Sequence, residues 1–257
     1  MKGSMPLKAS EIQLFGLAGI KEVVAGDPLG ELIVQAAAGS GVTLNDEDIL
    51  VIAQKIVSKA EDRLVELRQV EPSAETREWA EMWNRDPRLI ECVLREARRV
   101  VRMERGIVIV ETCHGFVCAN AGVDTSNVAD GWVSLLPENP DASAARIRQE
   151  ILEQTGRHVG VIISDTFGRP WREGLVNVAI GVAGTTALLD YRGQTDACGR
   201  ELHTTIIAVA DELASAAELL MGKALRIPVV LVRGLNLAEN GGTAGQLVRP
   251  SKQDLFR

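Results

Sequence analysis

The segment at residues 161–184 places two apolar runs on either side of a polar turn. The first run ends abruptly at Asp165 and Thr166, and a turn rich in glycine and proline then carries Arg169 and Arg172. A short apolar run bounded by turn residues indicates a buried strand. The chain must therefore build a sheet that carries a carboxylate, a hydroxyl and two guanidinium groups at one edge.

These four groups have the chemistry of a metal–phosphate site. Carboxylate and hydroxyl oxygens suit a hard cation, and forked guanidinium groups suit phosphate oxygens. A purely structural interpretation stays open at this point, because Asp165 and Thr166 could cap a turn and both arginines could be solvated.

Length and charge limit the class of protein. The chain has 257 residues, of which 46% are hydrophobic and 25% charged, which is typical of a globular protein with a sizeable core. We expect a single domain over residues 1–257, with two subdomains as the alternative. The net charge of -7 argues against nucleic acid as a partner and points to a small anionic ligand at local arginine clusters.

The cysteines and the hydropathy pattern favour a reduced, cytoplasmic protein. The four cysteines are too scattered for a disulfide framework. Cys113, His114 and Cys118 could begin a zinc site, but no second pair at metal spacing completes it. No apolar run approaches the roughly 20 residues of a membrane span, so we expect no membrane partner.

A second aspartate follows an apolar strand in the stretch 120–128. Asp124 lies there among small and amide residues, which would let a bulky ligand approach the backbone. Two such aspartates in one chain suggest carboxylates that converge on a cation. The residues alone therefore predict a divalent-metal site built from Asp124, Asp165 and Thr166, with metal-dependent phosphoryl chemistry.

Strands and helices alternate irregularly along the chain, which predicts a mixed α/β (α+β) fold. The run 49–53 is a central strand, and Lys55 and Lys59 directly after it could meet an anion or begin a solvated helix. Residues 87–103 are predicted to form one helix, because their apolar positions follow a helical stripe. The arginines within it are interpreted as a solvated face.

Four segments resemble the GTP-dependent gamma-glutamyl ligases of coenzyme F-420 biosynthesis. They are residues 120–128, 161–169, 172–181 and 232–236, and the likeness extends over residues 15–236. The tail resembles the bacterial form, in which a nitroreductase-like domain often follows. Because the chain stops there, we expect that second activity to be absent from this polypeptide.

The resemblance implies a reaction and a set of partners. Members add L-glutamate to the deazaflavin precursor through an amide bond, with GTP hydrolysed to GDP and phosphate by way of an acyl phosphate. It implies Mn²⁺ or Mg²⁺, with K⁺ as a further candidate ion. It also implies an intertwined homodimer with a fold of its own. Two alternatives remain: the same chemistry on another acid, or a non-catalytic protein that binds deazaflavin or nucleotide.

The resemblance also implies roles for individual residues. Asp124, Asp165 and Thr166 match the metal ligands, while Arg169 and Arg172 are assigned from chemistry alone as catalytic clamps for phosphate or carboxylate. At Lys223 the sequence departs from the archaeal pattern, in which an acidic metal ligand is expected, so a second metal would lack that ligand. The residues that match nucleotide contacts are Leu17, Ala18, Gly19, Ile20, Gln54, Lys55, Lys59, Asn127, Met221, Gly222 and Lys223.

Overall fold

The computed structural model describes residues 11–235, 237 and 241–255, so Asn236 of the last matching segment lies outside the described residues. The strands are β1 (Gln13–Leu17), β2 (Ile49–Ala53), β3 (Leu64–Glu66), β4 (Ala97–Glu104), β5 (Ile107–Thr112), β6 (Val117–Ala119), β7 (Trp132–Ser134), β8 (Gly160–Arg169), β9 (Arg172–Ala183), β10 (Leu189–Asp190), β11 (Ile206–Ile207) and β12 (Val229–Arg233). The helices are α1 (Leu29–Gly39), α2 (Gln54–Ala60), α3 (Ala74–Met82), α4 (Pro87–Arg95), α5 (Pro140–Thr155) and α6 (Val209–Met221), with short 3₁₀ turns η1 (Leu67–Gln69), η2 (Asn120–Gly122), η3 (Ala244–Leu247) and η4 (Ser251–Gln253).

A five-stranded mixed sheet forms the centre, in the order β1-β12-β2-β8-β9. Strands β2 and β8 pair in parallel, and the other neighbours in this sheet pair antiparallel. A parallel pair needs a crossover connection. Here the crossover is residues 54–159, and it contains a second, three-stranded sheet, β4-β5-β6.

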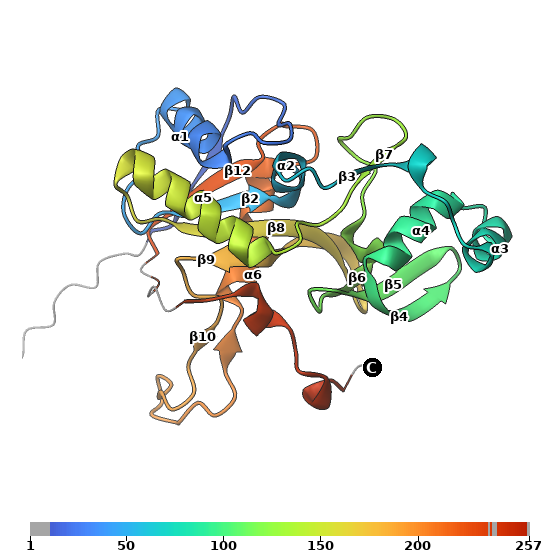
Figure 1. Ribbon diagram of the computed structural model, residues 1–257. Helices are drawn as coiled ribbons and strands as arrows, with labels where there is room; N and C mark the ends of the chain where they lie inside the picture. Colours follow the sequence, from blue (N-terminus) through green and yellow to red (C-terminus); the bar gives the residue numbers. More distant parts are fainter. Residues whose placement is uncertain (1–10, 236, 238–240, 256–257) are drawn as a thin grey trace, which may run out of the picture.

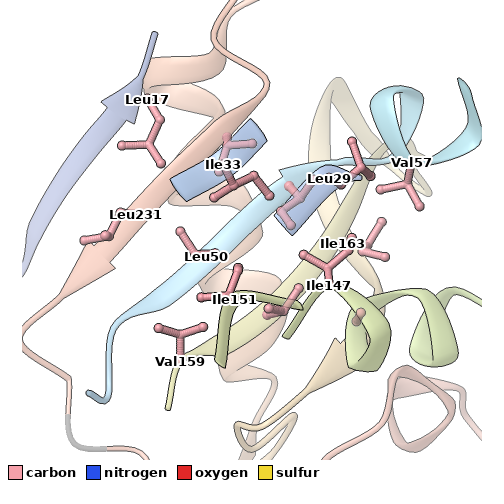
Figure 2. Packing of buried hydrophobic residues seen from close by; sticks show 14 of the residues in the cluster. Leu17, Leu29, Ile33, Leu50, Val57, Ile147, Ile151, Val159, Ile163 and Leu231 are labelled. Atoms are coloured by element: carbon pink, nitrogen blue, oxygen red, sulfur yellow. The ribbon is translucent and has the colours of Figure 1, made fainter. Parts of the chain in front are cut away.

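Helices cover both faces of the central sheet (Figure 1). Leu50 and Ile52 of β2 pack in the cluster with α1 and α5, while Ile49 and Val51 pack in the cluster with α6. Successive side chains of a strand point to opposite faces, so a strand buried on both faces is apolar throughout. Figure 2 shows the first cluster, with Leu50 and other strand residues among side chains from α1 and α5.

Capping residues define both ends of helix α5. Asn139 caps it by accepting a hydrogen bond from the Ala142 amide at 3.1 Å, and Pro140 fills the first turn. Gly156 closes the helix in the left-handed region, at φ 67°. Within the described ranges, no helix is both long and apolar enough to cross a membrane.

The predicted helix at residues 87–103 is wrong in its second half. Helix α4 ends at Arg95, and β4 follows immediately and pairs with β5. The β-branched pair Val100 and Val101 favours a strand, and both are exposed. The arginines at 98, 99 and 102 are exposed, as expected, and each pairs with a nearby glutamate.

The predicted strand end at Asp165 is also wrong. Strand β8 continues to Arg169 and turns directly into β9, so Asp165 lies inside a long hairpin. The neighbouring strand β2 ends at Ala53, which pairs with Ser164, so β8 extends beyond the end of β2. Asp165 and Thr166 therefore lie just past the end of β2, at the edge that the sequence predicted for them.

Candidate functional site

Four separate segments meet at one edge of the central sheet. Across the sheet, Leu17 pairs with Val229, Val229 with Ile52, and Ile52 with Ile163. The residues that follow β1, β2 and Ile163, and those that precede β12, therefore emerge side by side. This register places the predicted nucleotide segments 17–20 and 54–59 at the same edge as Asp165, and Lys223 of the segment 221–223 reaches Thr166 there at 2.7 Å.

Asp124 reaches this edge from the crossover segment. It follows η2, and its backbone forms an isolated bridge with Ser134. The ammonium group of Lys55 lies 2.7 Å from its Oδ2 atom and also donates to the Ser126 hydroxyl. Burial alone would raise the pKa of Asp124, but hydrogen bonds from Lys55 and the Ser126 amide lower this pKa below its ordinary value.

The surroundings of Asp165 disfavour its ionised form, in contrast to those of Asp124. Burial raises the pKa of Asp165 to about 6, and the negative charge of Asp124 adds to this rise. A hydrogen bond from the Thr166 amide and the charges of Lys55 and Lys223 oppose it only in part. Burial and the negative charge of Asp165 also act on the Cys118 thiol and raise its pKa to about 12.

Thr166 points to the opposite face of the sheet from Asp165, as successive strand residues do. Its hydroxyl donates to the Asn177 amide oxygen at 2.7 Å and accepts from Lys223 Nζ, also at 2.7 Å. Lys223 follows Met221, the last residue of α6, and Gly222, whose φ of 50° turns the chain back toward the sheet. The site thus occupies both faces past the end of β2.

The other nucleotide-segment residues surround this edge. Gln54 is buried, and its Nε2 atom has no hydrogen-bond partner, although its Oε1 atom accepts from Ser58. Lys59 is largely buried and pairs with the exposed Glu22. The Ala18 amide donates to the Ser40 hydroxyl. Asn127 is exposed in the left-handed region at φ 58°.

Arg169 and Arg172 do not join this cluster in the single chain. They pair at the tip of the β8–β9 hairpin, about 13 Å along the strand from Asp165 at the usual rise per residue. Arg169 donates to the Glu173 and Gly174 carbonyl oxygens, so its guanidinium group stabilises the turn. The clamp role of both arginines stays a prediction.

Asp124 and Asp165 fit a hard divalent cation. Asp165 is half-buried, and its pKa is raised partly because of Asp124, so a cation bound between the two like charges would relieve this repulsion. In the described part of the chain, no group of three or more His, Cys, Asp and Glu side chains converges to hold a metal. Water, phosphate or substrate oxygens would complete the coordination shell, as is common for Mg²⁺.

Two cavities lie away from this edge. One, of about 630 Å³, is lined between η1 and the start of α4, and the other, of about 560 Å³, lies at the start of α1. Neither is lined by a predicted site residue. The carboxylates and lysines instead form a half-exposed edge, with exposed side-chain fractions of 38% for Asp124 and 21% for Lys55.

The sequence interpretation missed three polar residues of the site. Ser126 contacts both Lys55 and Asp124. Asn177 is buried at 3% exposure within the apolar strand β9, and Glu218 of α6 accepts a hydrogen bond from it. A lone amide in an apolar strand was the available signal for Asn177. Glu218 had none, because its position on a helix is ordinary.

The fold is α+β, and lysines and paired carboxylates lie together at one edge of its central mixed sheet. The model of the family described as F420-0:Gamma-glutamyl ligase matches residues 19–234. The chain therefore belongs to this family and is an enzyme of the ligase class.

Three relatives are similar to this chain over most of its length. The chain is 48% identical over 250 residues to the coenzyme F420:L-glutamate ligase of Methanothermobacter thermautotrophicus, covering 96% of this chain and 99% of the relative. It is 47% identical to that of Methanocaldococcus jannaschii, over 89% of this chain and 90% of the relative. For the Archaeoglobus fulgidus ligase the identity is 40%, over 96% of both chains.

Proposed function

We propose that this protein joins L-glutamate to the deazaflavin precursor of coenzyme F-420 by an amide bond and consumes GTP in doing so. The names of the relatives support the acceptor and the amino acid. The observation that carries the proposal is the meeting of Lys55, Lys223, Asp124 and Asp165 at one sheet edge. Cations and paired carboxylates together are what phosphoryl transfer to a carboxylate requires.

The reaction has two steps, because a carboxylate is a poor acyl donor at neutral pH. In the first step, a carboxylate oxygen of the precursor attacks the gamma-phosphorus, and the bond to GDP breaks. In the second step, the amine of L-glutamate attacks the carbonyl carbon of the acyl phosphate. Phosphate leaves, and the nitrogen loses a proton. Positive groups stabilise the negative charge that gathers on the phosphate oxygens.

The residues divide this work between them. Lys55, Lys59 and Lys223 supply ammonium groups to the triphosphate, and the segment 17–20 and Asn127 supply further nucleotide contacts. Asp124 and Asp165 would hold Mn²⁺ or Mg²⁺, which offsets the repulsion between carboxylate and triphosphate, and the Thr166 oxygen would serve as a metal ligand on the other face of the sheet. K⁺ is a candidate for an additional ion. Glu22, the partner of Lys59, is 79% exposed, so that lysine can exchange it for a phosphate.

We also propose a homodimer in the cytoplasm. Trp171 and Leu175 are 80% and 65% exposed at the tip of the β8–β9 hairpin. Exposed apolar groups on a projecting hairpin suit burial against a second copy of the chain. Light scattering after size-exclusion chromatography should give twice the chain mass, and a monomer across the working concentration range would contradict the dimer.

The decisive experiment incubates the purified protein with the deazaflavin precursor, L-glutamate, GTP and Mn²⁺ or Mg²⁺. Mass spectrometry should find a product heavier by one or more glutamyl residues, with GDP formed in proportion. Absence of both GTP hydrolysis and glutamate addition would reject the ligase proposal. Glutamate addition to another acid, but not to the deazaflavin, would favour the alternative substrate.

A further inference from the structure

Asn177 is a buried amide in an apolar strand, and it links the site edge to helix α6. We propose that Asn177 and Glu218 fix the direction of the Thr166 hydroxyl hydrogen, so that the Thr166 oxygen meets the site only as an acceptor. They are then positioning residues that act through Thr166. This inference rests on the proposed metal–phosphate site.

The contacts form one chain of hydrogen bonds. Asn177 Nδ2 donates to Glu218 Oε2 at 2.9 Å, and Asn177 Oδ1 accepts from Thr166 Oγ1 at 2.7 Å. Asn177 is 3% exposed, so bulk water does not compete for its amide. Asn177 and Thr166 also face each other across the β8–β9 pair, which sets the distance between their side chains.

The chemistry of these groups allows only one direction along the chain. A carboxylate accepts hydrogen bonds and donates none, so the amide nitrogen of Asn177 must face Glu218. The amide oxygen then faces Thr166 and takes its single hydroxyl hydrogen. The lone pairs left on Thr166 Oγ1 can only accept. One of them now receives the ammonium group of Lys223 at 2.7 Å.

The direction matters because a free hydroxyl can rotate and present its hydrogen to the site. A hydroxyl in that orientation repels a metal ion and a lysine ammonium group alike. Glu218 has a second connection to the site, since its Oε1 atom lies 3.6 Å from Lys223 Nζ. The same carboxylate therefore orients Asn177 and partly balances the lysine charge.

The Asn177 side chain is separable from the packing of its strand. Its backbone carbonyl accepts a hydrogen bond from the Ser215 hydroxyl at 2.8 Å, so α6 also contacts β9 without the amide. Ser215→Ala removes that contact and leaves intact the hydrogen bonds that link Glu218, Asn177 and Thr166. It is therefore the matched control for loss of packing between α6 and β9.

The first test measures the affinity of the GTP-free protein for Mn²⁺ by electron paramagnetic resonance. Asn177→Ala and Glu218→Met should each weaken Mn²⁺ binding by about 10- to 100-fold, as loss of a partner that orients a metal ligand does. Ser215→Ala keeps the acceptor-only carboxylate of Glu218 and should bind within a few-fold of wild type. Wild-type affinity in Asn177→Ala would overturn the proposal.

The second test asks whether Asn177 acts through Thr166. Thr166→Val should weaken Mn²⁺ binding, and adding Asn177→Ala to it should cause no further loss. Independent, multiplying losses would overturn the positioning role, and circular dichroism at the assay temperature verifies that each variant is folded. Asp165→Asn separates the two proposals. If Asp165→Asn weakens Mn²⁺ binding and the Asn177 and Glu218 variants do not, this inference fails and the metal site stands. Unchanged affinity in Asp165→Asn rejects the metal site itself.

Discussion

Lys55 Nζ lies 2.7 Å from Asp124 Oδ2, and this ion pair joins helix α2, at the start of the crossover, to the segment that follows η2 later in the crossover. Lys55 lowers the pKa of Asp124 against the effect of burial, and its charge also opposes the rise in the pKa of Asp165. One ammonium group therefore keeps both carboxylates closer to their charged forms.

Lys55→Met removes this ammonium group. We expect kcat/KM for GTP to fall at least about 100-fold, because a preorganised cation is lost from the charge that develops on phosphate. Lys21→Met is the control, since Lys21 pairs with Asp27 at 2.7 Å and is 55% exposed. Steady-state assays of GDP release compare the two, and equal activities would remove Lys55 from the site.

Asp165→Asn should stabilise the metal-free protein while abolishing activity. The folded-state pKa of Asp165, about 6, lies above the ordinary value of an aspartate, so its ionised form destabilises the fold at pH 8. We expect the variant to gain about 2 kcal/mol in free energy of unfolding at pH 8. The gain should fall as pH drops through 6 and vanish near pH 4, where wild-type Asp165 is protonated.

Urea denaturation in the presence of a chelator measures this difference across the pH range. A gain that stays constant from pH 8 to pH 4 would contradict the assigned pKa. Retention of near-wild-type turnover would remove Asp165 from the metal site.

Arg233→Met should destabilise the fold by about 3 kcal/mol, because it leaves a buried carboxylate without its partner. Arg233 donates to both oxygens of Asp48 at 2.7 and 2.6 Å, and Asp48 is 2% exposed. The control is Arg157→Met, which breaks an exposed pair with Asp46 and should change stability little. Urea midpoints compare them, and similar small changes would show that water reaches Asp48.

Gly181→Ala should cost about 2 kcal/mol of stability, because α5 packs too closely on β9 for a methyl group. A Cβ atom at this position would lie 2.4 Å from the Pro140 carbonyl oxygen. Gly39→Ala, at the end of α1 with nothing within 4 Å, should be neutral or stabilising. Thermal unfolding of both variants checks the contrast, and an unchanged midpoint in Gly181→Ala would show that α5 can shift.

Local signals predicted the elements whose sequence and environment agree. The run 49–53 is buried on both faces and is a strand with those bounds. The stripe at residues 87–103 misled because it continues across the junction between α4 and β4. There the pairing of β4 with β5 decides the outcome, and helical periodicity cannot report that pairing.

The sequence predicted those site residues whose own side-chain chemistry and local position are distinctive. Asp124, Asp165 and Lys55 stood out because charges beside buried strands need a reason, whereas Lys223 was singled out only by the family resemblance. The contact between Asn177 and Glu218 spans 41 positions, so no local pattern contains it. Arg169 shows the converse, because its residue type suggested a clamp and its neighbours in the turn already accept its hydrogen bonds.

Because of the crossover between β2 and β8, the candidate site can form only when the crossover has packed against the central sheet. Asp165 belongs to the central sheet, whereas Asp124 belongs to the crossover. The crossover contains the β4-β5-β6 sheet and a separate apolar cluster. Phe116, just before β6, packs edge-on against Phe167 of β8, and this contact fastens the two parts together beside the carboxylates. A chain whose crossover has not yet packed can form the central sheet before Asp124 reaches Asp165, so affinity at the proposed cation site would report on packing of the crossover as well as of the sheet.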